Sequence, residues 1–97
     1  MSGPLSFHQF QAWIREHYHD RDSARGTAAT FMWLVEEVGE LATALHRASE
    51  GSGTGNLEEE FADVLGWLAT LANMHGVDLE AALRRKYLDR EVPARHK

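Results

Sequence analysis

Two short acidic runs contain the residue types in this chain that could do chemistry. The first run holds Glu36, Glu37 and Glu40, and the second holds Glu60 and Asp63. Residues three positions apart share one face of a helix, so Glu37 pairs with Glu40 and Glu60 pairs with Asp63. If two helices fold back on each other, four carboxylates converge. Such an oxygen-rich site suits Mg²⁺ or Mn²⁺.

The direction of the second pair separates a metal site from an ordinary solvated surface. On a helical wheel, Glu60 falls between Leu57 and Leu71, within an apolar stripe. A carboxylate that points into apolar surroundings is costly unless it is paired or binds a metal. The alternative is that Glu60 is one more first-turn acid complementing the helix dipole, and that the first run is a solvated helix face.

Four helices are expected to position these acids, at about residues 6–19, 27–49, 57–75 and 79–90. The polar segment His19–Gly26 is predicted to be a loop. The glycine-rich segment Gly51–Asn56 cannot support a helix. No segment alternates as a strand would, so the sequence predicts a single all-α domain over residues 1–97, with four helices in a bundle-like arrangement.

Capping residues support three of the predicted helix starts. Ser6 and Gln9 have the spacing of a capping box, and Asn56 with Glu59 repeats it at the third helix. Asp78 is expected to cap the fourth helix.

The second and third helices each have a broad apolar stripe at the spacing of a core-facing side. In the second helix this stripe contains Phe31, Leu34, Val35, Val38, Leu41, Ala42 and Leu45. In the third it contains Leu57, Phe61, Val64, Leu65, Leu68, Leu71 and Ala72. The sequence leaves open how Glu40 and Glu60 come to lie at the same height along the two helices, because Glu40 lies far before the glycine turn and Glu60 lies just after it. Either the turn climbs back along the second helix or that helix ends early.

Composition limits the classes of function. A chain of 97 residues is too short for two ordinary domains, and its net charge of −5 argues against a nucleic-acid partner. The absence of cysteine excludes a disulfide framework and a thiolate metal site. No window is long and apolar enough to span a membrane, and the start lacks the features of a signal peptide. We therefore expect no membrane partner and a cytoplasmic location.

A site for phosphate chemistry, the commonest use of paired acids that hold Mg²⁺, also needs cations. The fourth helix supplies several basic residues. Lys86 is the best placed to turn toward the bundle, because it neighbours the apolar residues Leu79 and Leu83 on the wheel. The other basic residues there are more typical of a solvated face.

The acids stand in the order EExxE…ExxD, and the chain continues through Leu71–Glu80 (LANMHGVDLE) to Lys86-Tyr87. In these features, over roughly Phe7 to Arg90, the sequence resembles the MazG-like all-α nucleoside triphosphate pyrophosphohydrolases. Each half of the acidic motif is common in helices. The two halves in order, with the asparagine and lysine downstream, are specific.

The resemblance implies hydrolysis of a (d)NTP between its α and β phosphates, giving a (d)NMP and pyrophosphate, with house-cleaning of the nucleotide pool as the expected role. It implies a Mg²⁺ cofactor, with Mn²⁺ possible, held by Glu37, Glu40, Glu60 and Asp63. Glu36 would be a nearby acid that orients water or a further metal.

The resemblance also implies substrate contacts by Lys86 and Asn73. Many relatives have a second lysine and an asparagine shortly after the first lysine, whereas this chain has Leu88–Glu91 (LDRE). Arg90 could replace the missing cation. Trp67 lies along the same arc as the acids, where it either stacks on a base or packs in a core or an interface.

The large side chains off the main stripes, Trp13, Met32, Trp33 and Trp67, suggest a partner surface. The resemblance implies a homodimer or homotetramer with sites near the subunit contacts.

Three alternatives remain. A related activity is phosphoribosyl-ATP pyrophosphohydrolase, which the GVDLE…KY segment disfavours. A different class is a non-catalytic helical module for metal binding or oligomerisation. Glu16 and His19 form an ExxH element typical of di-iron bundles, but the sequence has no second one.

Overall fold

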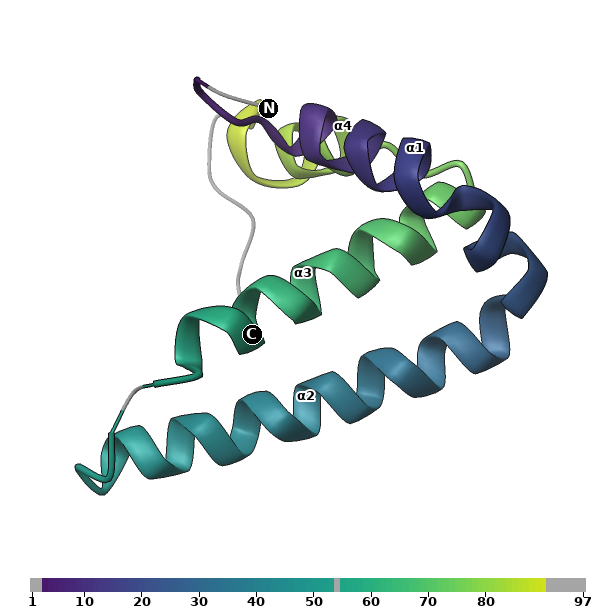
Figure 1. Cartoon of the computed structure of the whole chain (residues 1–97). Helices are drawn as coiled ribbons and strands as arrows, with labels where there is room; N and C mark the ends of the chain where they lie inside the picture. Colours follow the sequence, from purple (N-terminus) through teal and green to yellow (C-terminus); the bar gives the residue numbers. More distant parts are fainter. Residues whose placement is uncertain (1–2, 54, 91–97) are drawn as a thin grey trace.

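The computed structural model describes residues 3–53 and 55–90. The prediction of an all-α, bundle-like fold is confirmed. The described residues form α1 (Phe7–Arg25), α2 (Thr27–Ser49), α3 (Leu57–Met74) and α4 (Leu79–Leu83), followed by a π-helical turn η1 (Arg84–Leu88). In Figure 1, α2 and α3 run antiparallel, while α1 crosses α3 on the side away from α2 and α4 lies beside α1.

The start of α1 follows the sequence prediction. The backbone N–H of Gln9 donates to the hydroxyl of Ser6 at 3.0 Å, and the backbone N–H of Ser6 donates to the side chain of Gln9 at 3.0 Å. This reciprocal pair is the predicted capping box. It satisfies two backbone donors that the first turn would otherwise leave without a partner.

The predicted loop over His19–Gly26 is wrong, because α1 continues to Arg25. The extension contains no glycine or proline, and it is anchored by the buried side chain of Asp22. One oxygen of Asp22 accepts from Arg25 at 3.0 Å, and the other accepts from the hydroxyl of Thr70 on α3 at 3.1 Å. Gly26, with a φ of 85°, then ends the helix in a conformation that favours glycine.

Of the other two predicted N-caps, one is confirmed and one is wrong. The carboxylate of Asp78 accepts from the backbone N–H of Ala81 at 3.1 Å, which confirms it as the cap of α4. Asn56 occupies the N-cap position of α3 but makes no capping hydrogen bond with its side chain, so the capping box with Glu59 is wrong. The predicted fourth helix over 79–90 is also wrong in detail, since the α-helical part ends at Leu83 and the π turn ends at Leu88.

The apolar stripes of α2 and α3 are only partly buried. Leu34 is buried, but Phe31 is 55% exposed, Val38 46%, Phe61 48% and Leu65 44%. α1 packs on a different side of α3, and α4 is short. The described helices therefore leave much of these broad stripes exposed. The prediction that the whole stripes face a core is therefore wrong for this chain on its own.

The exposed apolar residues of both helices lie on one side of the α2–α3 pair. On each helix they are offset in the same rotational sense from the residues that face the other helix. In an antiparallel pair, equal offsets of this kind fall on the same side. We call the residues Phe31, Val35, Val38, Leu45, Phe61, Leu65 and Leu68 the apolar face.

Candidate functional site

Three of the predicted metal ligands meet between α2 and α3. Glu37 of α2 and Glu60 and Asp63 of α3 each offer one carboxylate oxygen, and these atoms lie within 4.8 Å of one another. The helical wheel directed Glu60 inward, and its side chain does turn toward α2. This carboxylate cluster fits a hard divalent cation by the chemistry of its donors. Within the described residues, the Glu16–His19 pair does not belong to a comparable group.

Two oxygens of the carboxylate cluster are buried without a partner. Among the described residues, neither Oε2 of Glu37 nor Oε2 of Glu60 has a hydrogen-bond partner. A buried acceptor that makes no hydrogen bond is destabilising, and more so if it is charged. A cation bound by Glu37 and Glu60 would give these carboxylates a partner, which supports a divalent metal at the carboxylate cluster.

The electrostatics of the carboxylate cluster point the same way. Burial, followed by the negative charges of Glu40, Asp63, Glu60 and Glu36, raises the pKa of Glu37 to about 7. Burial, followed by the charges of Glu40 and Asp63, also raises the pKa of Glu60. Without a cation these carboxylates repel one another, and a divalent ion would reverse that repulsion.

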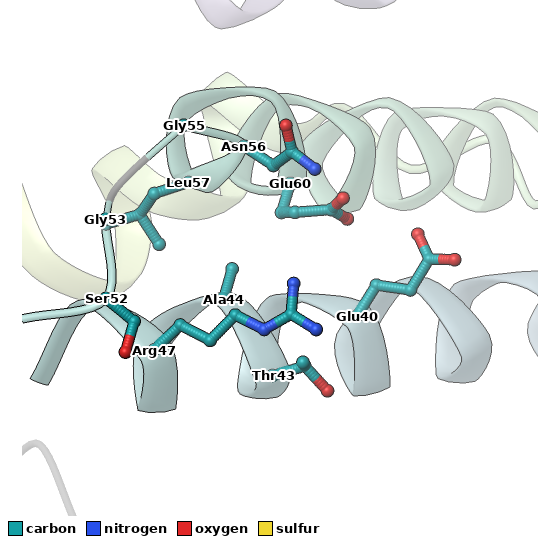
Figure 2. Close-up of a pocket in the computed structure, with 10 residues that line it drawn as sticks. All are labelled: Glu40, Thr43, Ala44, Arg47, Ser52, Gly53, Gly55, Asn56, Leu57 and Glu60. Carbon is teal, nitrogen blue, oxygen red and sulfur yellow. The ribbon is translucent and has the colours of Figure 1, made fainter. Parts of the chain in front are cut away.

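Glu40 lies beside the carboxylate cluster, although its oxygens are not among the three that meet. It lines an open cavity of about 540 Å³ together with Glu60, and Figure 2 shows its carboxylate turned toward that of Glu60 across the α2–α3 gap. Ala44 of α2 and Leu57 of α3 line the same cavity. The start of α3 therefore lies opposite Ala44, before α2 ends at Ser49. The turn therefore climbs back along α2, which places Glu40 and Glu60 at similar heights.

Glu36 is exposed on α2 and does not join the three oxygens that meet. Its charge still contributes to the raised pKa of Glu37. It is close enough to act on the cluster electrostatically.

A second cavity, of about 370 Å³, lies between α1 and α3, and Asp63 is one of the residues that line it. Its lining is rich in aromatic and basic side chains, including Phe10, Trp13, Tyr18, Arg21, Arg25 and Trp67. The ring of Trp67 stacks on that of Trp33, with centroids 6.3 Å apart and an angle of 13° between the planes. The guanidinium of Arg25 lies 4.9 Å from the centre of the Trp67 ring, in the geometry of a cation–π contact.

Two arginines near the acids were missed by the sequence prediction. Arg25 was assigned to a loop, although it lies in the last turn of α1 and fixes Asp22. Arg47 lines the same cavity as Glu40 and Glu60. Its spacing of seven residues from Glu40 places it two turns along the same face of α2, and that periodicity could have found it.

The remaining predicted substrate contacts are placed away from the carboxylate cluster. Asn73 lies ten residues beyond Asp63 on α3, and its side chain is bound to α1. It accepts from the amide of Gln11 at 3.1 Å and donates to the carbonyl of Gln11 at 3.0 Å. Lys86 lies over the ring of Tyr87 at 5.4 Å, and Arg90 reaches back toward the carbonyl of Arg85 at 3.5 Å. Neither Lys86 nor Arg90 lines either cavity beside the acids.

Within the part of the chain that the structure describes, no helix is both long and apolar enough to cross a membrane.

Two comparisons with known proteins bear on this site. Residues 25–92 match the family model described as the MazG nucleotide pyrophosphohydrolase domain, and that range contains all five acids. The chain is also similar to "Uncharacterized protein YvdC" of Bacillus subtilis (strain 168). The two are 32% identical over an alignment that covers 76% of this chain and 82% of YvdC.

Proposed function

The chain belongs to the MazG nucleotide pyrophosphohydrolase family, and from that premise we propose that it hydrolyses a nucleoside triphosphate to a monophosphate and pyrophosphate in a Mg²⁺-dependent reaction. Mn²⁺ is the alternative cation. The observation that supports this most is the pair of unpartnered, buried oxygens on Glu37 and Glu60, within a carboxylate cluster that two helices form. Removal of unwanted triphosphates from the nucleotide pool is the role that fits such an activity.

In the proposed reaction, the oxygen of a water molecule bonds to one of the two phosphorus atoms that flank the α–β bridging oxygen. The bond from that phosphorus to the bridging oxygen breaks, its electron pair stays with the leaving phosphate group, and one proton is released. A bound Mg²⁺ would neutralise phosphate charge and orient the triphosphate group of the substrate. Glu37, Glu60 and Asp63 would hold it, with Glu40 beside them. Glu36 would help to orient the water.

Trp67 is proposed to contact the nucleoside end of the substrate. It lines the same cavity as Asp63, and its ring contacts both Trp33 and the guanidinium of Arg25, so a stacked base would take the place of one of these two contacts. A rigid indole is a good surface for stacking a base. Such a contact predicts a KM that depends on the base, and an identical KM for every base would contradict it.

We also propose that the substrate is contacted by Lys86, Arg90 and Asn73. Lys86 and Arg90 follow α4, which packs on α1, and do not line the cavity between α2 and α3. They would have to approach the substrate of a neighbouring subunit. Asn73 would have to exchange its hydrogen bonds with Gln11 for contacts to the substrate.

We also propose that the protein is a homo-oligomer, a dimer or a tetramer, in which a second copy covers the apolar face. Large exposed apolar patches mark interaction surfaces. Glu40, Asp63 and Trp67 are offset in the opposite rotational sense from the apolar face, so the site opens on the other side of the α2–α3 pair. A second copy can therefore bury the apolar face without closing the site.

The activity is tested by incubating pure protein and Mg²⁺ with a panel of NTPs and dNTPs and identifying the products. We expect monophosphate and pyrophosphate, with at least a hundredfold loss of kcat/KM in Glu60→Gln because a ligand of the carboxylate cluster loses its charge. The matched control is Glu58→Gln, which changes an exposed acid in the first turn of the same helix and should act like the wild type.

Other outcomes separate the alternatives. Diphosphate and phosphate as products would contradict the assigned bond. No turnover in protein that still binds Mg²⁺ would favour phosphoribosyl-ATP or another modified nucleotide. No turnover and no metal binding would favour a non-catalytic helical module.

A further inference from the structure

The open cavity beside Glu40 and Glu60 contains an arginine that the proposed reaction has not yet used. In Figure 2 the side chain of Arg47 extends along α2 inside this cavity, and its guanidinium lies on the same side as the carboxylates of Glu40 and Glu60. Within the described residues, the guanidinium of Arg47 makes no hydrogen bond and no salt bridge at 4.0 Å or less. The side-chain ion pairs among residues 3–53 and 55–90 lie elsewhere, at Asp22–Arg25, His8–Asp78 and His46–Glu50.

Arg47 makes no ion pair with the acids beside it, so its guanidinium remains available to another partner. If a divalent cation binds the carboxylate cluster, the acids attract Arg47 less strongly, and its five N–H donors remain open to an anion. Arginine suits phosphate because its planar fork can donate two parallel hydrogen bonds to two oxygens. Apart from Leu57 and the acids Glu40 and Glu60, the cavity lining around Arg47 is small or polar, with Thr43, Ala44, Ser52, Gly53, Gly55 and Asn56.

The beginning of α3 adds to the preference for an anion. Asn56 and Leu57 line the cavity, and Asn56 does not cap the helix with its side chain. The first intrahelical donor after this cap is the N–H of Glu60, which donates to the carbonyl of Asn56 at 2.9 Å. The N–H groups before it have no partner within the helix, and such groups favour negative charge.

The two cavities differ in the part of a nucleotide that they suit. The one between α1 and α3 offers aromatic rings beside Arg21 and Arg25, of which Arg25 is paired with Asp22 and lies over Trp67, whereas the one with Arg47 offers a cation and polar groups but no aromatic ring. The carboxylate cluster lies between them, since Glu60 lines the first and Asp63 the second. A triphosphate that spans the metal site would therefore have its nucleoside at Trp67 and its phosphate end at Arg47.

We propose that Arg47 binds the β- and γ-phosphates of the nucleotide and then the pyrophosphate product, so that it fixes which way the substrate lies across the metal site. This inference rests on the proposed function. It assigns the cation that the sequence prediction sought on the fourth helix to the end of α2 instead.

The test compares wild type with Arg47→Gln and Arg47→Lys, using inorganic pyrophosphate as the probe. Binding of pyrophosphate is measured by calorimetry at saturating Mg²⁺, and the monophosphate of the fastest substrate is titrated in parallel. We expect Arg47→Gln to weaken pyrophosphate binding at least tenfold and to raise the KM for the triphosphate by a similar factor. Monophosphate binding should change less than twofold. Arg47→Lys should recover part of the loss, because it keeps the charge without the fork.

Arg84→Gln is the matched control, because it removes an exposed arginine of η1 that lines neither cavity. It should leave the binding of both probes unchanged. Equal losses of pyrophosphate and monophosphate binding in Arg47→Gln would overturn the inference, and so would unchanged pyrophosphate binding.

Failure of this inference can be told from failure of the proposed function. Normal turnover and normal pyrophosphate binding in Arg47→Gln would overturn the role of Arg47 and leave the activity standing. No turnover of any nucleotide by the wild type would overturn the activity. The calorimetric comparison would still decide whether Arg47 holds pyrophosphate.

Discussion

At the scale of single residues, the site is a set of acids that the fold holds in an unfavourable state. Glu37 is the clearest case, since burial and four neighbouring carboxylates raise its pKa to about 7 from an ordinary 4.5. Carboxylates that repel one another keep their protons at a higher pH than usual. Such raised pKa values are common at functional sites, and a metal ion is one ligand that would relieve the repulsion. The consequence can be measured without any knowledge of the substrate.

The stability of the metal-free protein should fall between about pH 4.5 and pH 7 because of Glu37. The folded state holds the Glu37 proton more tightly than the unfolded state does, so the contribution is favourable at low pH and is lost as pH rises through the folded pKa. After screening by solvent we expect a change on the order of 1–2 kcal/mol in the free energy of unfolding. Urea unfolding in the presence of a chelator, from pH 4.5 to pH 8, measures it.

Histidines titrate in the same interval, so the decisive quantity is the difference between wild type and Glu37→Gln. The variant should lose this part of the pH dependence, while Glu58→Gln should keep it. Millimolar Mg²⁺ should raise the melting temperature of the wild type at pH 8 and have little effect on Glu37→Gln. Parallel pH profiles for the wild type and Glu37→Gln would show that Glu37 is not held in this way.

At the scale of elements, the extension of α1 past Tyr18 connects three helices. Asp22 joins Arg25 of its own helix to Thr70 of α3, and Arg25 also donates to Thr30 of α2 at 3.3 Å. Thr30 is fully buried. This hydrogen-bonded network fixes the corner where α1 turns into α2, and it holds the guanidinium that lies over Trp67.

Replacing Asp22 by alanine should destabilise the protein by about 2–4 kcal/mol, because it leaves a partly buried arginine without its carboxylate. Chemical unfolding measures the loss, and a concurrent rise in KM would show that the corner also positions Trp67. Asp20→Ala, an exposed acid of the same helix, is the control and should change stability by less than about 0.5 kcal/mol. A loss for Asp22→Ala as small as that would mean that the network is not needed to hold the corner.

At the scale of the whole molecule, the two sides of the α2–α3 pair have different tasks. One side holds the acids and both cavities beside them, and the other is the apolar face. A chain of this length buries a smaller fraction of its surface on folding than a larger domain does, so an exposed apolar face of this kind is a reason for association.

Leu65→Lys should convert the proposed oligomer to a monomer, because it places a charge at the centre of a buried contact. Light scattering after size-exclusion chromatography measures the mass. Met32→Lys is the control, since Met32 is 72% exposed on α2 but lies outside the apolar face. A wild type that is already monomeric at high concentration would contradict the proposal, as would a Leu65→Lys variant that keeps the mass of the wild-type oligomer.

The sequence by itself determined the all-α class, the start of α1, the extents of α2 and α3, the identity of the acids and the inward direction of Glu60. These follow from periodicity and spacing, which act over a few residues of one chain segment. Only the tertiary structure decided that α1 continues to Arg25, because the anchor of that extension is Thr70 on a distant helix. It also decided that α3 begins beside Ala44, that Asn73 is bound to Gln11, and that Arg47 shares a cavity with the acids. Each of these depends on how far one helix is shifted along another, and no local pattern records that shift.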